Sequence, residues 1–126
     1  MTMRVLVVDD ILVNVILLAE RLKLASYQVV TAMSGEEALR IIRQSPPDIV
    51  LLDVMMPGMS GYEVCQQIRR EEKSARLPVV MVTALDRDSD RQIGLEAGAD
   101  EFLTKPVEDD ALFPAMQRAT RKRSHQ

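Results

Sequence analysis

Three short apolar runs, each rich in β-branched side chains, constrain the fold of this chain more than any other feature. They are Val5–Val8, Ile49–Leu52 and Val79–Val82. Continuous runs of this length are typical of strands that are buried on both faces, as in a parallel sheet. Gln28–Ala32 and Glu101–Thr104 are weaker strand candidates. Helix-period segments lie between them, so the order strand–helix repeats five times. This order predicts an α/β fold with a doubly wound, five-stranded parallel sheet and helices on both faces.

Local signals mark where several helices begin and end. Ser34 with Glu37, and Ser60 with Glu63, match the capping box, in which each partner satisfies an orphan backbone N–H group. Gly98 stands where a left-handed C-terminal cap is needed. The first helix is expected to carry one broad apolar stripe, formed by Val13, Ile16, Leu17, Leu18, Leu22 and Leu24. Pro114 falls inside the last helical pattern, so that helix is either kinked early or begins later than the pattern suggests.

The length of 126 residues predicts a single domain, which we place at residues 1–121, followed by a short basic tail or the start of a linker at 122–126. A net charge of −3 and 3% aromatic residues argue against a nucleic-acid binder. The apolar runs are too short to cross a membrane. The single cysteine, Cys65, cannot form an internal disulfide, and we expect it to be buried and inert. These features predict a cytoplasmic protein.

Chemically distinctive residues follow the expected strands. They are Asp9 and Asp10 after the first, Asp53 after the third, Thr83 after the fourth and Lys105 after the fifth. Each has an ordinary explanation alone, such as a turn or helix cap for an aspartate. Together they would converge at one edge of a parallel sheet, where like charges repel unless a cation is present. Lys105 supplies one positive charge, and all-oxygen ligands suit Mg²⁺ for the rest.

A carboxylate beside Mg²⁺ can act as a nucleophile toward phosphorus. A neighbouring ammonium and hydroxyl can bind the phosphoryl oxygens, so Asp53, Lys105 and Thr83 are the residue types that such a site requires. There is no His/Cys cluster for zinc, because the chain has one histidine, His125, and one cysteine. The strand ends therefore indicate a Mg²⁺-dependent phosphoacceptor.

At these motifs the chain resembles the receiver domains of two-component response regulators, which have a flavodoxin-like (βα)5 fold. The resemblance rests on Val7-Val8-Asp9-Asp10, Leu51-Leu52-Asp53-Val54-Met55-Met56-Pro57-Gly58, Val82-Thr83-Ala84, Gly98-Ala99-Asp100 and Phe102-Leu103-Thr104-Lys105-Pro106. Within the family, the run from Leu52 to Met59 and the run from Phe102 to Pro106 are most similar to the first receiver of the cell-cycle diguanylate-cyclase response regulators.

The resemblance implies a role for each matching residue. Asp53 is the phosphoacceptor. Asp9, Asp10, Asp53 and the backbone carbonyl of Met55 hold Mg²⁺. Thr83 and Lys105 each bind a phosphoryl oxygen, and the backbone N–H groups of Val54 and Ala84 complete the cradle. Phe102 is the aromatic residue that turns inward with Thr83 on activation. The bond between Lys105 and Pro106 is expected to be cis.

The resemblance also implies partners. The phosphodonor would be the phosphohistidine of a histidine kinase or phosphotransfer protein, and the domain would modify itself without turning over a separate substrate. Phosphorylation would switch the face built from the fourth helix, fifth strand and fifth helix, and output would fall to a partner or to a C-terminal domain that follows. Charges on that face would favour a homodimer and are carried by Arg91, Glu96, Asp100, Glu101, Arg118 and Arg121.

Three other functions fit the same topology less well. A flavin-binding protein would need a small-residue phosphate loop after the first strand, where this chain has Asp9-Asp10-Ile11-Leu12. An aspartate-nucleophile phosphatase usually needs a cap domain, for which the chain is too short. A receiver-like module without phosphorylation would not need the acids, Thr83 and Lys105. Met55 and Leu85, both apolar, flank the expected phosphoryl group and predict slow dephosphorylation, because neither can orient an attacking water.

Overall fold

The computed structural model, which describes residues 2–124, has one sheet of five parallel strands in the order β2-β1-β3-β4-β5. The strands are β1 (Arg4–Val8), β2 (Gln28–Ala32), β3 (Ile49–Leu52), β4 (Val79–Thr83) and β5 (Glu101–Thr104). The helices are α1 (Leu12–Leu24), α2 (Gly35–Gln44), α3 (Gly61–Arg70), α4 (Asp88–Ala97) and α5 (Asp109–Ser124). The expected doubly wound fold is therefore confirmed, and β4 extends one residue further than expected to include Thr83.

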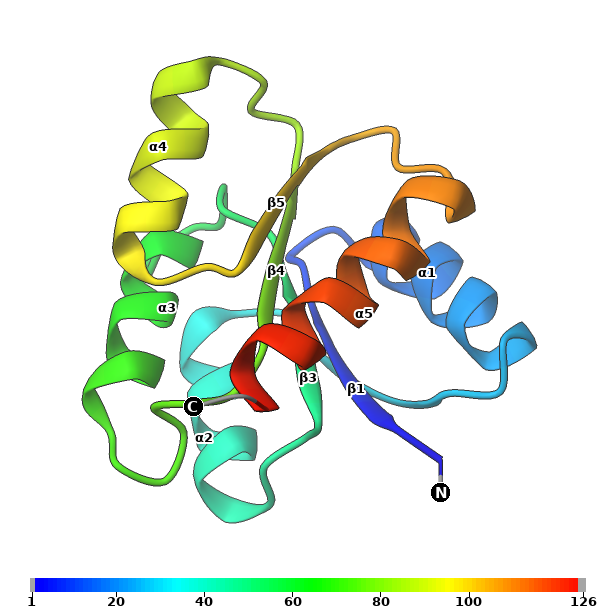
Figure 1. Ribbon diagram of the computed structural model, residues 1–126, viewed down its shortest axis with the longest axis horizontal. Coiled ribbons are helices and arrows are strands. Elements are labelled where there is room, and N and C mark those ends of the chain that lie inside the picture. Colours follow the sequence, from blue (N-terminus) through cyan, green and yellow to red (C-terminus); the bar gives the residue numbers. More distant parts are fainter. Residues whose placement is uncertain (1, 125–126) are drawn as a thin grey trace.

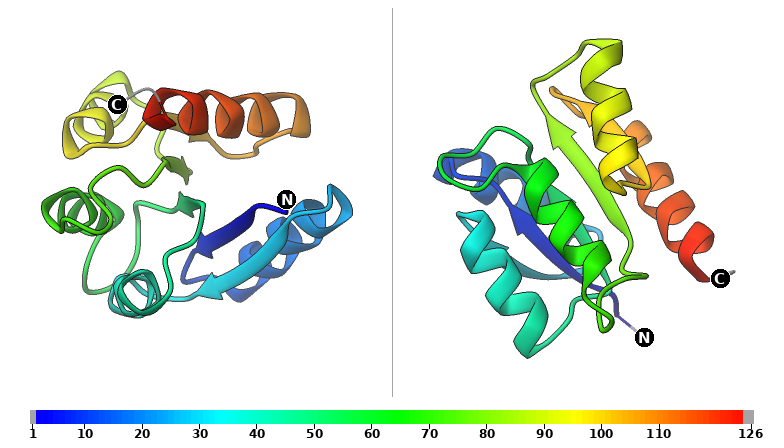
Figure 2. Two further views of the ribbon diagram at one scale, coloured as in Figure 1. Left: turned by 60° about the horizontal axis from the view of Figure 1, so that its bottom comes forward. Right: turned by 90° about the vertical axis from the view of Figure 1, so that its left-hand side faces the viewer.

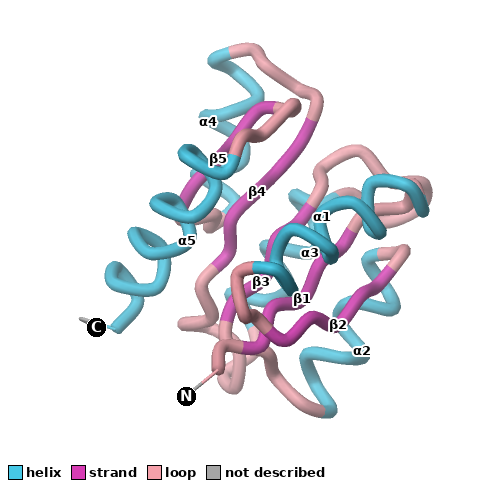
Figure 3. The backbone as a smooth tube through the Cα atoms, turned by 90° about the vertical axis from the view of Figure 1, so that its right-hand side faces the viewer, coloured by secondary structure: helices cyan, strands magenta, loops and turns pink. Residues whose placement is uncertain are grey.

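Helices cover both faces of the sheet, with α1 and α5 on one side and α2, α3 and α4 on the other (Figures 1 and 2). The three continuous apolar strands are buried on both faces, as their composition predicts. Each face has its own core cluster: Leu52, Ile68 and Met81 lie in one, and Leu51 and Leu112 in the other. Strand β1 is hydrogen-bonded to both β2 and β3, so the strand order reverses beside it (Figure 3).

The helix caps agree with the sequence in part. Ser60 and Glu63 form the expected capping box at α3, and Gly98 caps α4 with φ 116°. At α2 the Ser34 hydroxyl accepts the N–H of Glu37, but the Glu37 carboxylate accepts the N–H of Met33, so the expected second half of that capping box is wrong. Glu37 bonds one residue further back than a capping box requires.

Helix α5 begins at Asp109, before Pro114, so a later start is excluded. The helix continues to Ser124, which places residues 122–124 of the expected tail inside it. Residues 125–126, including His125, lie outside the described residues, and the domain boundary at residue 121 stays a prediction.

Helix α1 differs most from expectation. Its buried residues are Val15, Ala19 and Leu22, whereas four members of the expected inward stripe are exposed: Val13, Ile16, Leu17 and Leu24. The helix is thus apolar on two faces, one packed on the sheet and one facing solvent, and a single-stripe interpretation cannot separate them.

Cys65 is fully buried in α3, and burial raises the pKa of its thiol to about 11. The expected burial of Cys65 is confirmed, and a thiol with a raised pKa is a poor nucleophile at neutral pH. In the part of the chain that the structure describes, no helix combines the length and the apolar character needed to cross a membrane.

Candidate functional site

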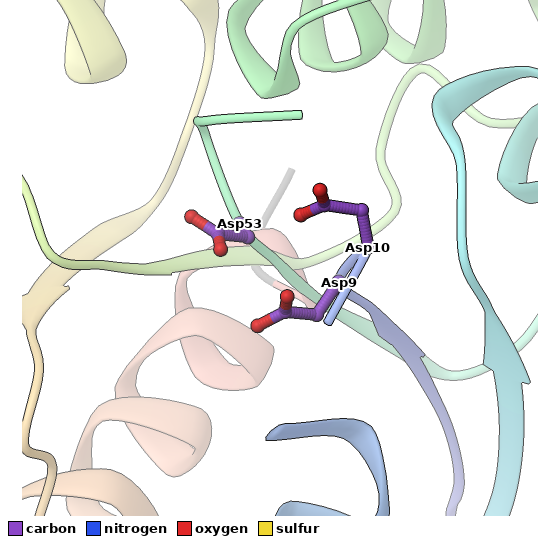
Figure 4. Close-up of side chains that lie close together, drawn as sticks. All are labelled: Asp9, Asp10 and Asp53. Carbon is purple, nitrogen blue, oxygen red and sulfur yellow. The ribbon is translucent and has the colours of Figure 1, made fainter. Parts of the chain in front are cut away.

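Three carboxylates meet at the carboxyl edge of the sheet, where the strand order reverses (Figure 4). Asp9 and Asp10 follow β1, and Asp53 follows the neighbouring strand β3. These aspartates meet because Val8 at the end of β1 pairs with Leu52 at the end of β3. One carboxylate oxygen from each of the three lies within 4.8 Å of the others. Parallel pairing of β1 and β3 is thus sufficient to bring together aspartates that are more than forty positions apart in sequence.

Lys105 connects two of these acids from the loop after β5. Its ammonium nitrogen lies 2.7 Å from Asp9 Oδ2 and 3.1 Å from Asp53 Oδ2. Burial alone would lower the pKa of Lys105, but hydrogen bonds and the charges of the two aspartates outweigh it and raise the pKa. Lys105 therefore stays charged through neutral pH, and its stabilising contribution is lost only as the pH rises through that raised value.

Asp9 and Asp53 also stabilise the turns that follow their strands, which is the ordinary role of an aspartate at such a position. Asp9 Oδ1 accepts the N–H of Ile11 at 3.0 Å, and Asp53 Oδ1 accepts the N–H of Met55 at 3.3 Å. Each of these two carboxylates therefore fixes its turn with one oxygen and faces Lys105 with the other. The turn bond holds the side chain in place, so the structural role supports the chemical one.

Asp10 is different from its neighbours. Its Oδ1 atom is buried and has no hydrogen-bond partner among the described residues. A buried carboxylate oxygen without a donor, beside two further carboxylates, is an unfavourable arrangement unless a cation is bound. All-oxygen donors in a compact acidic cluster suit Mg²⁺, so the residues present fit that ion.

Thr83 and Phe102, the two residues expected to act together as a switch, are both buried. Thr83 closes β4 with 0% exposure, and its hydroxyl oxygen accepts the N–H of Leu85 at 3.4 Å. Phe102 is 3% exposed and packs beside Gly94 of α4, where an added Cβ would lie 2.7 Å from its ring. The bond between Lys105 and Pro106 is cis. Met55, whose backbone carbonyl is the expected fourth ligand, has an exposed side chain beside Asp53.

A cavity of about 420 Å³ opens from this cluster between α1 and the loop after β5. Asp9, Asp53 and Lys105 line one end, and Asn14, Leu17 and Arg21 belong to the α1 wall. Sequence patterns gave no signal for this cavity, because its walls come from segments that only the tertiary fold brings together.

The chain belongs to the response regulator receiver domain family, whose model matches residues 5–117. It is 50% identical over 121 residues to the response regulator PleD of Caulobacter vibrioides, covering 96% of this chain and 27% of that protein. This similarity confirms the expected resemblance to the first receiver of the diguanylate-cyclase regulators. The chain is also 44% identical over 106 residues to the transcriptional regulatory protein PhoP of Bacillus subtilis, and this match covers 84% of the chain and 43% of that protein. The chain thus spans less than half the length of these curated relatives.

Solved structures of receivers have the same fold. A response regulator from Chloroflexus aurantiacus superposes with a TM-score of 0.92 at 36% identity, covering 96% of this chain and 99% of that one. The receiver domain of the sensor histidine kinase PA1611 from Pseudomonas aeruginosa, solved with a magnesium ion coordinated in its active-site cleft, gives a TM-score of 0.88 at 29% identity. The match covers 96% of this chain and 99% of that one. The chain is therefore a signalling module of two-component phosphorelay systems.

Replacing Asp10 with Asn should stabilise the metal-free protein by about 1 kcal/mol, because it removes one like charge and a buried unpartnered anion. Added Mg²⁺ should raise the melting temperature of the wild type and not that of D10N. Calorimetry in EDTA and then in millimolar Mg²⁺ measures both effects, with Glu72→Gln, an exposed acid, as the control. A D10N protein that melts below the wild type in EDTA would show that Asp10 has a stabilising partner.

Proposed function

We propose that this domain accepts a phosphoryl group on Asp53 from a phosphohistidine donor and that the modification switches the face formed by α4, β5 and α5. The main support is that the Lys105 ammonium forms ion pairs with both Asp53 and Asp9, within a cluster of three carboxylates. Within the family, this constellation is that of a phosphoacceptor site.

The proposed reaction is an in-line displacement at phosphorus. A carboxylate oxygen of Asp53 forms a new P–O bond, the P–N bond to the donor imidazole breaks, and the electron pair leaves with the imidazole. Lys105 stabilises the phosphoryl oxygens and Thr83 binds one of them after transfer. Asp9, Asp10, Asp53 and the Met55 carbonyl would hold Mg²⁺, which supplies charge neutralisation when bound. The product is a modified surface, not a released metabolite.

Intact mass after incubation with acetyl phosphate and Mg²⁺ tests the proposal. We expect a single phosphoryl adduct in the wild type and none in Asp53→Ala. The absence of an adduct in the wild type, under conditions that label an authentic receiver, would instead favour a module that binds without being phosphorylated. An adduct that persists in Asp53→Ala would place the acceptor elsewhere.

The outer face of α1 supports a protein as the phosphodonor. Leu12, Val13 and Leu17 are 57%, 60% and 61% exposed beside the mouth of the acidic cluster. Several large apolar side chains exposed on one helix of a small domain favour a protein contact there. We place the docking surface of a histidine kinase or phosphotransfer protein here, since its phosphohistidine must reach Asp53.

Val13→Gln should slow phosphoryl transfer from a phosphohistidine protein about fivefold, because an interface contact of about 1 kcal/mol is lost. The rate with acetyl phosphate should stay within about twofold of the wild type, since that donor needs no docking surface. Leu24→Gln is the matched control, because Leu24 lies at the far end of the same helix and is 86% exposed. Equal slowing by both variants with both donors would contradict docking at this face.

A phosphorylation-favoured homodimer through α4, β5 and α5 is part of the proposal. Ile93 and Leu95 of α4 are exposed apolar residues. Arg118 pairs with Glu101 within the chain and would have to exchange partners, whereas Asp100 is buried and cannot pair across the interface as the sequence suggested. Sedimentation with and without beryllofluoride tests the dimer, and a monomer in both conditions would rule it out.

We also propose that an output domain follows residue 126 and that the protein is cytoplasmic. The full reading frame would test both proposals, because it would show any further domain and any targeting segment.

A further inference from the structure

Another buried carboxylate, that of Asp100, lies at the edge of the sheet opposite to Asp53. Asp100 immediately precedes β5, and its side chain is 0% exposed. Its Oδ2 accepts the N–H of Val79 at 2.9 Å and lies 3.1 Å from Arg69 of α3. Its Oδ1 accepts Nε of Arg123, from the last turn of α5, at 2.7 Å. One carboxylate thus joins the starts of β4 and β5 to the ends of α3 and α5.

The same two guanidinium groups bind the end of α4. Arg69 Nε donates to the carbonyl oxygen of Gly98 at 3.0 Å, and Arg123 Nη2 donates to it at 3.3 Å. Gly98 is the left-handed cap of α4. Arg123 therefore contacts both elements whose displacement the proposed switch requires: the C-terminal cap of α4 and the residue that leads into β5.

The two arginines are held differently. Arg69 also donates to the carbonyl oxygens of Ala75 and Leu77, so the loop after α3 fixes it independently of α5. Burial and the nearby charge of Arg123 lower the pKa of Arg69, while Asp100 opposes this effect. The contacts of Arg123 with Asp100 and Gly98, by contrast, reach from α5 to the corner between α4 and β5.

This corner is connected to the switch face through the backbone. Phe102 lies two residues after Asp100 on β5, and its carbonyl oxygen accepts Nη1 of Arg91 from α4 at 3.0 Å. A shift of α4 or of Phe102 therefore acts on Asp100 and Gly98 over a short stretch of ordered chain. Buried, charge-assisted hydrogen bonds depend strongly on distance, so Arg123 would respond to such a shift.

We propose that Arg123 couples the phosphorylation state of Asp53 to the last turn of α5. In the unmodified domain, Asp100 and the Gly98 carbonyl hold Arg123 and order that turn. Displacement of α4 and β5 loosens the two contacts and frees the turn, which makes the end of α5 a second responsive surface beside the α4–β5–α5 face. This inference rests on the proposed function, because it requires the same modification of Asp53.

Amide hydrogen exchange of residues 120–124 tests the coupling. In the wild type, Mg²⁺ with beryllofluoride should lower protection of these amides about threefold or more, since the opening free energy of the turn falls. In Arg123→Met, protection should already be lower without beryllofluoride, by roughly 10-fold, because a hydrogen bond to a charged group is lost. Beryllofluoride should then cause no further change at these amides. Lys122→Met is the matched control, since it removes an exposed cation from the same turn of α5.

The outcomes separate this inference from the proposed function. A beryllofluoride response near Asp53 with none at residues 120–124 would overturn the coupling and leave the phosphoacceptor intact. An Arg123→Met variant that keeps the full response would show that Arg123 is not the link. The absence of any response near Asp53 would overturn the proposed function, and the coupling with it.

Discussion

Lys105→Met is expected to slow phosphorylation by acetyl phosphate at least about 100-fold, the usual effect of removing a preorganised group that stabilises a developing negative charge. The Lys105 ammonium lies 3.1 Å from the Asp53 carboxylate, and only 26% of the Lys105 side chain is exposed. In the proposed reaction, the phosphoryl group enters the space that this ammonium faces. The charge of Lys105 is then available where the transferring oxygens arrive, in surroundings that screen it less than water does.

Intact mass of samples quenched at successive times gives the phosphorylation rate, and two further variants serve as comparisons. Lys105→Arg keeps the charge but replaces a compact ammonium by a planar fork, so we expect an intermediate rate. Lys73→Met removes an exposed lysine between α3 and β4, at the opposite edge of the sheet, and should leave the rate unchanged. A Lys105→Met protein that keeps more than about a third of the wild-type rate would assign charge stabilisation to other groups in the cluster.

The strand ends could be predicted from sequence because a parallel sheet converts separate positions into neighbours. Asp9 and Asp53 each follow a continuous apolar run, and such runs have few alternatives to buried parallel strands. Once β1 and β3 pair in parallel, both aspartates emerge at one edge, and Lys105 does so after β5. The local pattern and the topology agree here, so the site follows from the sequence without any knowledge of side-chain packing.

The buried ion pairs could not be predicted in the same way. Arg123 looked like part of a basic tail because nothing nearby in sequence suggests a partner, and Asp100 looked like a surface charge. Their contact depends on where the end of α5 crosses the corner between α4 and β5. The exposed face of α1 was missed for a related reason. Apolar residues surround much of that helix, so periodicity alone cannot tell which of them the sheet covers.

Gly61→Ala is expected to be the most disruptive substitution of a single small residue in this domain. A Cβ at Gly61 would lie 2.2 Å from the carbonyl oxygen of Asp53 and 2.7 Å from the Cα atom of Val54. Both neighbours are backbone atoms, so no side chain can rotate away. The N–H of Gly61 also donates to the Val54 carbonyl at 2.8 Å, which holds the start of α3 against this turn. The added methyl group must therefore push α3 away from the segment that carries Asp53, the proposed phosphoacceptor.

The cost should be about 3 kcal/mol of unfolding free energy, measured by urea denaturation, as for other overpacked sites. Phosphorylation should fall with it, because the displaced atoms belong to Asp53 itself. Gly35→Ala is the matched control and should lose less stability: Gly35 also begins a helix, but its nearest contact is a side-chain methyl group of the buried Val64 at 2.6 Å and not a backbone atom. If both variants lost the same stability, the rigidity of the backbone around Asp53 would not be the deciding factor. If Gly61→Ala lost stability but kept its phosphorylation rate, the turn after β3 would tolerate displacement without loss of the site.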